Sequence, residues 1–197
     1  MRLLLFSSFM MLLSTLDAQP GKTAATDFLG VSGPIKIYGS TYSLAWSSHP
    51  SPQYYKQEYL KAGEKLEKFG SMVMVEVLTG VPDHKQIVAA KLKELDQMKA
   101  NNPIVNYETF ENKQAGEFMI DFLLSANEAD GSIQILERNV YRYKSIIDKQ
   151  GKKAVLLFAV SVRSYGKQAT IFLAELKGKR SALIDQVAQF KLPAPAI

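Results

Sequence analysis

The two histidines are the first candidates for chemistry, because imidazole titrates near neutral pH and serves as a base or a metal ligand. His49 follows Ser47 and Ser48, so a hydroxyl nucleophile and a base stand next to each other in the sequence. Sequence neighbours on a loop rarely have the geometry of such a pair, and His84 stands in the expected first turn of a helix. No metal-site spacing accompanies either histidine. We therefore expect two exposed histidines and no metal or cofactor.

Carboxylates are the second candidates, since a pair of them can hydrolyse a glycosidic bond. Glu58, Glu64 and Glu67 follow one another closely, but each has a lysine two to four residues away, which favours a solvated charged face. The sequence has no Gly-x-Ser-x-Gly elbow, no phosphate-binding loop and no dinucleotide-binding glycine pattern. A secreted hydrolase that uses these carboxylates or the Ser/His loop is kept as the alternative hypothesis.

The other polar candidates lie on three expected strands, 117–125, 132–146 and 154–165, which are rich in β-branched and aromatic residues. The loops between them, 127–131 and 148–153, are short and polar, which is typical of an antiparallel meander. Counting outward from the middle of each loop predicts which residues stand opposite one another and share a face of the sheet.

Glu137 and Asn139 are predicted to face the core from the middle strand, with Glu137 between Ile120 and Val162. The same face carries the apolar and aromatic residues Ile133, Ile135, Tyr141 and Tyr143. Buried polar groups need hydrogen-bond partners. They therefore indicate either a polar ligand pocket between sheet and helices or an inward pair satisfied by the backbone or a tyrosine hydroxyl. A register that is wrong by one residue would instead turn both outward.

Three arginines and one aspartate are predicted on the opposite face. Arg138, Arg142 and Arg163 alternate there, and Asp121 lies two strands from Arg163. This pattern predicts either a solvated lattice of ion pairs, which contributes little stability, or a face that binds an anion or a protein partner. The ligand-binding candidates are therefore Glu137, Asn139, Arg138, Arg142 and Arg163.

The remaining segments complete the expected fold. Hydrophobic spacing and turn residues predict a strand or hairpin at 35–46, strands at 72–78 and 104–110, helices at 83–100 and 168–190, and an ambiguous stretch at 54–69. Strands, a helix, more strands and a final helix are typical of an α+β domain. We expect a single twisted antiparallel sheet with two helices packed on one face. Trp46 alternates with Tyr42 and Leu44, so it should lie in or near the core.

The beginning of the chain predicts export. Met1 and Arg2 form a short basic start, residues 3–16 are mostly apolar, and Ala18 is the best cleavage residue. The apolar run is too short for a membrane span, which needs about 20 residues, and no later stretch is predicted to cross a membrane. The expected organisation is a signal peptide (1–18), a flexible leading segment (19–33), a single α+β domain (34–192) and a loose tail (193–197).

The composition excludes several classes of site. With no cysteine, the chain has no disulfide, no catalytic thiol and no cysteine-bound zinc. It also has no Asn-x-Ser/Thr glycosylation site, which favours a bacterial protein exported to the periplasm or the cell exterior. The net charge of +5 is spread along the chain, and without a dense basic stripe a nucleic-acid partner is not expected.

Two segments resemble small exported bacterial proteins of uncharacterised function: Tyr-Lys-Gln-Glu-Tyr-Leu at 55–60 and Glu-Arg-Asn-Val-Tyr-Arg-Tyr at 137–143. The order of elements over residues 35–190 also resembles the Mog1/PsbP-like α+β sandwich. That resemblance implies a binding or accessory role more than catalysis and assigns no residue. The leading hypothesis is an exported, non-enzymatic accessory or binding domain for a protein or a small ligand.

Overall fold

The computed structural model describes residues 24–81 and 83–197, and the predicted signal peptide lies outside them. The elements are β1 (Ile35–Ile37), β2 (Ser40–Ser51), β3 (Tyr54–Leu60), β4 (Ser71–Thr79), α1 (Lys85–Lys99), β5 (Asn106–Asn112), β6 (Glu117–Asn127), β7 (Ile133–Ile147), β8 (Lys153–Tyr165) and α2 (Lys167–Gln189). The expected strands and helices are thus present within a few residues. The ambiguous stretch begins with a strand, β3.

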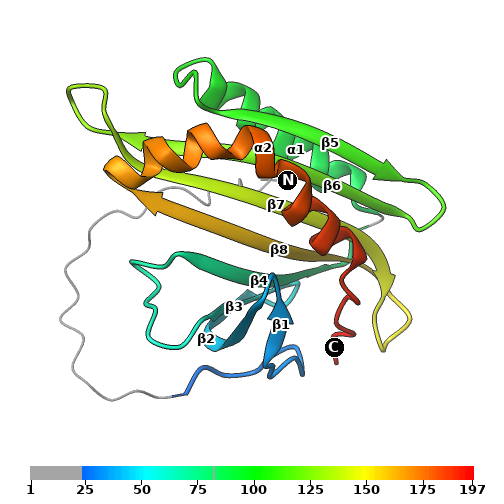
Figure 1. Ribbon diagram of the computed structural model, residues 1–197. Coiled ribbons are helices and arrows are strands. Elements are labelled where there is room, and N and C mark those ends of the chain that lie inside the picture. Colours follow the sequence, from blue (N-terminus) through cyan, green and yellow to red (C-terminus); the bar gives the residue numbers. More distant parts are fainter. Residues whose placement is uncertain (1–23, 82) are drawn as a thin grey trace.

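All strands belong to one antiparallel sheet in the order β1-β2-β3-β4-β8-β7-β6-β5. Two meanders, β1–β4 and β5–β8, therefore meet where β4 pairs with β8. The sheet curls, so that β1 to β3 fold toward the C-terminal part of α2 (Figure 1). This architecture confirms the expected fold class, α+β with one antiparallel sheet.

The two helices cover opposite faces of the sheet. Leu183 and Val187 of α2 pack in one buried cluster with Val75, whereas Leu95 of α1 packs in another with Met74. Neighbouring residues on a strand point to opposite faces, so the two clusters lie on opposite sides. The prediction that both helices share one face is corrected by this finding. It also explains why β4 and the first part of β8 are apolar on both faces.

The register of the long meander differs from the predicted one in two ways. Glu137 stands opposite Leu124 of β6, four residues from the expected partner, and an even shift leaves every residue on its predicted face. On β8, Glu137 stands opposite Arg163 instead of Val162, and this single-residue shift turns the whole of β8 over. Its cause is the turn, which closes with the Asp148 amide donating to the carbonyl of Lys152.

Trp46 is 38% exposed, contrary to the expected core position. A β-bulge explains the difference. Leu44 pairs with Tyr59 while Trp46 pairs with the adjacent Glu58, so one extra residue of β2 fits between them. Trp46 is thereby turned to the opposite face from the fully buried Tyr42.

Both ends of the domain are held by hydrogen bonds. The fully buried Gln57 accepts a bond of 2.8 Å from the amide of Leu29. The carbonyl of Leu29 in turn accepts from the amide of Ala196, and the Lys149 amide donates to the carbonyl of Ile197. The end of the leading segment and the tail, expected to be flexible and loose, therefore have fixed partners in the folded protein.

Candidate functional site

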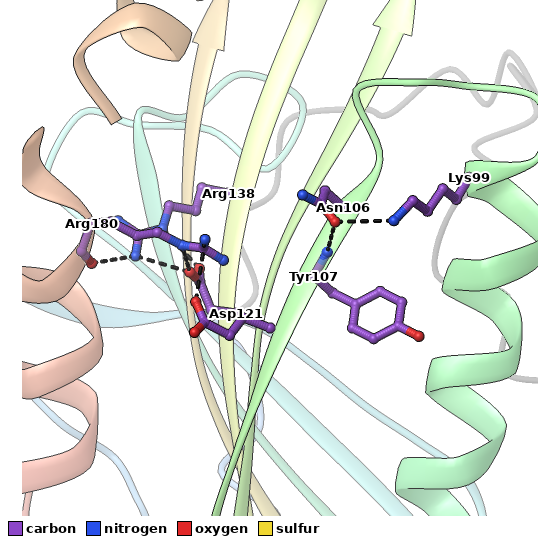
Figure 2. Close-up of polar contacts among 7 residues, drawn as sticks. Lys99, Asn106, Tyr107, Asp121, Arg138 and Arg180 are labelled. Carbon is purple, nitrogen blue, oxygen red and sulfur yellow. Dashed lines mark hydrogen bonds and ion pairs between the residues drawn. The ribbon is translucent and has the colours of Figure 1, made fainter. Parts of the chain in front are cut away.

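Arg138 and Asp121 form a buried ion pair that joins the sheet to α2. The Arg138 Nε lies 2.8 Å from Asp121 Oδ1, and the two side chains are 5% and 2% exposed. Arg180 of α2 contacts the other Asp121 oxygen, and its carbonyl accepts a hydrogen bond from Arg138 (Figure 2). Because these groups satisfy one another, the predicted arginine face is a docking surface for α2 within the domain.

Arg142 forms a second junction of the same kind. Its guanidinium donates to Glu117 Oε2 at 2.8 and 3.0 Å and to the carbonyls of Val187 and Phe190 at 2.8 and 2.9 Å. Lys144 contacts the other Glu117 oxygen at 3.0 Å. Burial alone would raise the pKa of Glu117, but hydrogen bonds from Lys144 and Arg142 outweigh it and hold that pKa below its usual value.

The other three candidates lie on the α1 face. Arg163 donates to Glu137 at 2.6 Å and stacks 4.1 Å above the ring of Phe69. Asn139 accepts a hydrogen bond from Ser161, and its buried Nδ2 has no partner within the described residues. The five predicted residues are therefore split between two faces, and no single cavity brings them together.

The expected hydrolase candidates do not assemble in the described part of the chain. The His49 Nδ1 lies 3.0 Å from the carbonyl of Tyr54, its ring stacks 4.0 Å from that of Tyr55, and neither adjacent serine hydrogen-bonds to it. Glu58 pairs with Lys56, whereas Glu64 lies in the following loop. No group of three or more acidic or histidine side chains among the described residues converges to hold a metal.

One serine–histidine contact was not expected from the sequence. His84 is only 8% exposed, which corrects its predicted exposure, and its Nδ1 lies 3.0 Å from Ser145 Oγ. The same hydroxyl accepts a bond of 3.3 Å from the His84 amide at the start of α1. No carboxylate contacts the imidazole in the described residues. The two residues are far apart in sequence, so no spacing signalled the pair.

Lys56 occupies a charged cage on the α1 face. Its ammonium lies 2.9 Å from Glu58, 3.7 Å from Glu76 and 6.0 Å from the ring centre of Trp46. Burial would lower the pKa of Lys56, but the two carboxylates outweigh it and raise that pKa. Tyr54 donates to Glu76 at 2.8 Å, and burial followed by this carboxylate raises the pKa of its phenol. The cage is therefore already occupied by the Lys56 ammonium.

An open space lies between the β1–β2 turn and α2. A cavity of about 190 Å³ is lined mainly by apolar side chains, and an open hollow of about 570 Å³ adjoins it along β1. Tyr38 lines both spaces, which we name together the hairpin groove. The apolar lining of the smaller cavity comes from Tyr38, Val162, Phe172, Leu176 and Leu183.

Tyr38 has an uncommon backbone conformation for an aromatic residue. Its φ is 52°, and it is the only non-glycine with a positive φ in the described part of the chain. Gly39 follows with a φ of 65°, so the two residues form a type I′ turn, in which the first position favours Asn, Asp or Gly. The Tyr38 side chain is nevertheless 41% exposed at the edge of the groove.

Comparison with known proteins places the chain in a group. Residues 29–192 match one protein-family model, which spans most of the described domain. The chain belongs to that family, whose function is uncharacterised. No curated protein and no solved structure matches. The resemblance to the Mog1/PsbP-like sandwich therefore stays a prediction. No helix in the described residues has the length and apolarity to cross a membrane.

Proposed function

We propose that this protein is an exported, non-enzymatic binding domain that holds its partner in the hairpin groove. The observation that carries the proposal is Tyr38. A bulky residue in the left-handed region costs of order 1–3 kcal/mol, and such strain is concentrated at functional sites. Because 41% of Tyr38 is exposed, burial within the domain offsets only part of that cost. We propose that contact with a partner offsets the rest.

The smaller cavity of the groove supplies a place for an apolar anchor. Its volume is about 190 Å³, and an apolar cavity of roughly 150 Å³ is large enough to hold benzene. The part of the cavity wall that belongs to α2 consists of the apolar Phe172, Leu176 and Leu183 and of the ion pair Glu175–Lys179. One aromatic ring or branched aliphatic group of a partner therefore fits beneath Tyr38.

The substitution Tyr38→Asn separates function from stability. Asparagine suits the first position of a type I′ turn, so the variant should be as stable as wild type or more stable by about 1 kcal/mol in urea unfolding. Benzene serves as the probe of the anchor cavity and should shift the amide resonances of Leu176 and Leu183. The variant should also lose the partners that the immobilised wild type retains from the native exported fraction. Retention of the same partners by Tyr38→Asn would overturn the proposal.

The hydrolase alternative is favoured by one observation, the 3.0 Å contact between Ser145 and His84. A serine activated by this histidine would react with a fluorophosphonate probe. We expect no labelling, because the Ser145 hydroxyl also accepts a hydrogen bond from the His84 amide and no carboxylate orients the imidazole in the described residues. Labelling that disappears in Ser145→Ala would establish the hydrolase and displace the binding proposal.

A further inference from the structure

We infer that the hairpin groove binds an extended, acidic stretch of polypeptide, which adds a strand to the outer edge of β1 and inserts one apolar side chain beneath Tyr38. This inference rests on the proposed function and names the chemistry of its partner. It follows from the free edge of β1, the lining of the groove and its charge.

The outer edge of β1 is open. β1 pairs only with β2, and the other edge of the sheet is β5. In a two-residue hairpin the flanking pair, here Ile37 and Ser40, exchanges both backbone hydrogen bonds, and such pairs alternate along the ladder. Lys36, opposite Thr41, is therefore in a pair without ladder bonds, so its amide and carbonyl point away from β2. No turn, loop or cap in the described residues uses these two groups.

The larger hollow lies beside this edge, and its walls contain both polar and apolar side chains. Lys36 lines it from β1, and Gln186 and Gln189 line it from α2. Its volume of about 570 Å³ accommodates a short extended segment rather than a folded element. An added strand would receive backbone bonds from Lys36, while the two glutamine amides can bond its other edge.

The charge of the groove favours an acidic segment. The residues that line the larger hollow include Lys36 but no Asp or Glu. Lys36 has no ion-pair partner among the described residues, whereas Lys179, at the smaller cavity, is already paired with Glu175 at 2.8 Å. A carboxylate on the bound segment would therefore meet an unpaired ammonium. A small apolar molecule would fill only the smaller cavity and would leave the backbone of Lys36 untouched.

Synthetic peptides test the inference directly. The probes are acetylated octapeptides of alternating Thr and Val with one central Phe, carrying either two Asp or two Lys, and an N-methylated version of the acidic peptide that cannot pair as a strand. With ¹⁵N-labelled protein, the acidic peptide should shift the amides of Lys36, Tyr38 and Leu176 and slow hydrogen exchange at Lys36. The basic and N-methylated peptides should bind at least about tenfold more weakly.

Two substitutions at one position separate backbone from charge. Lys36→Pro removes both the ammonium and the outward amide on an edge strand, where proline is tolerated, and should bind the acidic peptide about tenfold more weakly than Lys36→Gln does. Lys36→Gln keeps the backbone bonds and should weaken only the preference for the acidic over the basic peptide. Circular dichroism checks that both variants fold. If Lys36→Pro does not fold, the N-methylated peptide still decides the question.

The possible outcomes distinguish failure of the strand-addition inference from failure of the proposed function. In one outcome, the peptides and benzene shift the Leu176 amide, but Lys36→Pro binds the acidic peptide as Lys36→Gln does, and the N-methylated peptide binds as the unmodified peptide does. The groove then binds ligands, but strand addition is wrong. If neither benzene nor any peptide shifts Tyr38 or Leu176, the proposed function itself fails. Peptide binding that maps to β5 instead would also overturn the inference.

Discussion

Asp121 holds two arginines at once, and its removal should therefore be costly. Asp121→Ala leaves the buried Arg138 without a carboxylate and Arg180 with Glu108 alone, and breaking a buried pair in this way costs about 3–5 kcal/mol. Urea unfolding measures the loss. The matched control is Glu108→Ala, since Glu108 contacts the same Arg180 at 3.2 Å but is 52% exposed, and its loss should stay within about 1 kcal/mol. Equal effects of the two substitutions would contradict the structure.

Glu117 should make stability depend on pH in a defined direction. Its pKa is held low in the folded state, so the stability it contributes is present above the unfolded value of about 4.3 and is lost as pH falls through the folded pKa. Wild type should exceed Glu117→Gln in unfolding free energy at neutral pH, and the difference should shrink below about pH 4. Urea titrations at several pH values measure it. A difference that grew on acidification would contradict the lowered pKa.

Tyr38 shows the limit of sequence reasoning at the scale of single residues. The alternation of Ile35 and Ile37, the break at Gly39 and the later alternation predicted a strand or a hairpin at this place. Tyrosine at the first turn position is uncommon, so composition alone did not mark it. Its proposed role depends on α2, which is distant in sequence and forms the other wall of the groove.

At the scale of elements, the pattern of faces was easier to predict than the register. Glu137 and Asn139 lie on the predicted face because a shift of four residues on β6 preserves alternation. On β8 the observed register differs from the predicted one by one residue, which places Arg163 opposite Glu137. The register of this strand pair depends on the hydrogen-bonded turn after Ile147. The centre of a loop estimated from composition is not accurate to one residue, so it does not determine the register of the two strands.

The sequence also contained an indication that the two helices cover opposite faces of the sheet. β8 begins with an unbroken apolar run, Ala154 to Val160, and all of these residues are buried. A strand with no polar alternation is covered on both faces, so this run indicates helices on opposite sides of the sheet. The cover that α2 provides also accounts for the buried Arg138 and Arg142, which were expected to form either a solvated lattice of ion pairs or a face that binds an anion or a partner.

Arg142 should determine how firmly the last turn of α2 is held. Lysine keeps the charge but cannot bond Glu117 and the carbonyls of Val187 and Phe190 together. In Arg142→Lys, amide hydrogen exchange in the last turn of α2 should be about 10 to 100 times faster, from the loss of about 1.5–3 kcal/mol. Lys144→Gln is the control, because Lys144 contacts Glu117 without touching α2. Unchanged exchange in Arg142→Lys would show that α2 does not depend on this cap.

At the scale of the whole molecule, export is open to a direct measurement. We expect mass spectrometry of the protein from its native source to find an N-terminus at or next to Gln19, because Ala18 is the best cleavage residue. Leu29 is fully buried only ten residues later, so cleavage there leaves the domain intact. Recovery of intact Met1 in the soluble exported fraction would exclude a cleaved signal peptide.

The pairing of β4 with β8 has a consequence for how the chain folds. Ser71 stands opposite Val162, so the paired residues of β4 and β8 are far apart in the sequence, and this pairing should form slowly. Until β8 has been synthesised, the apolar β4 is an open edge, which favours aggregation. We therefore expect the complete sheet to form only after nearly the whole chain has been made. A chain that ends before Lys153 should appear in the insoluble fraction, whereas the full-length chain should be soluble.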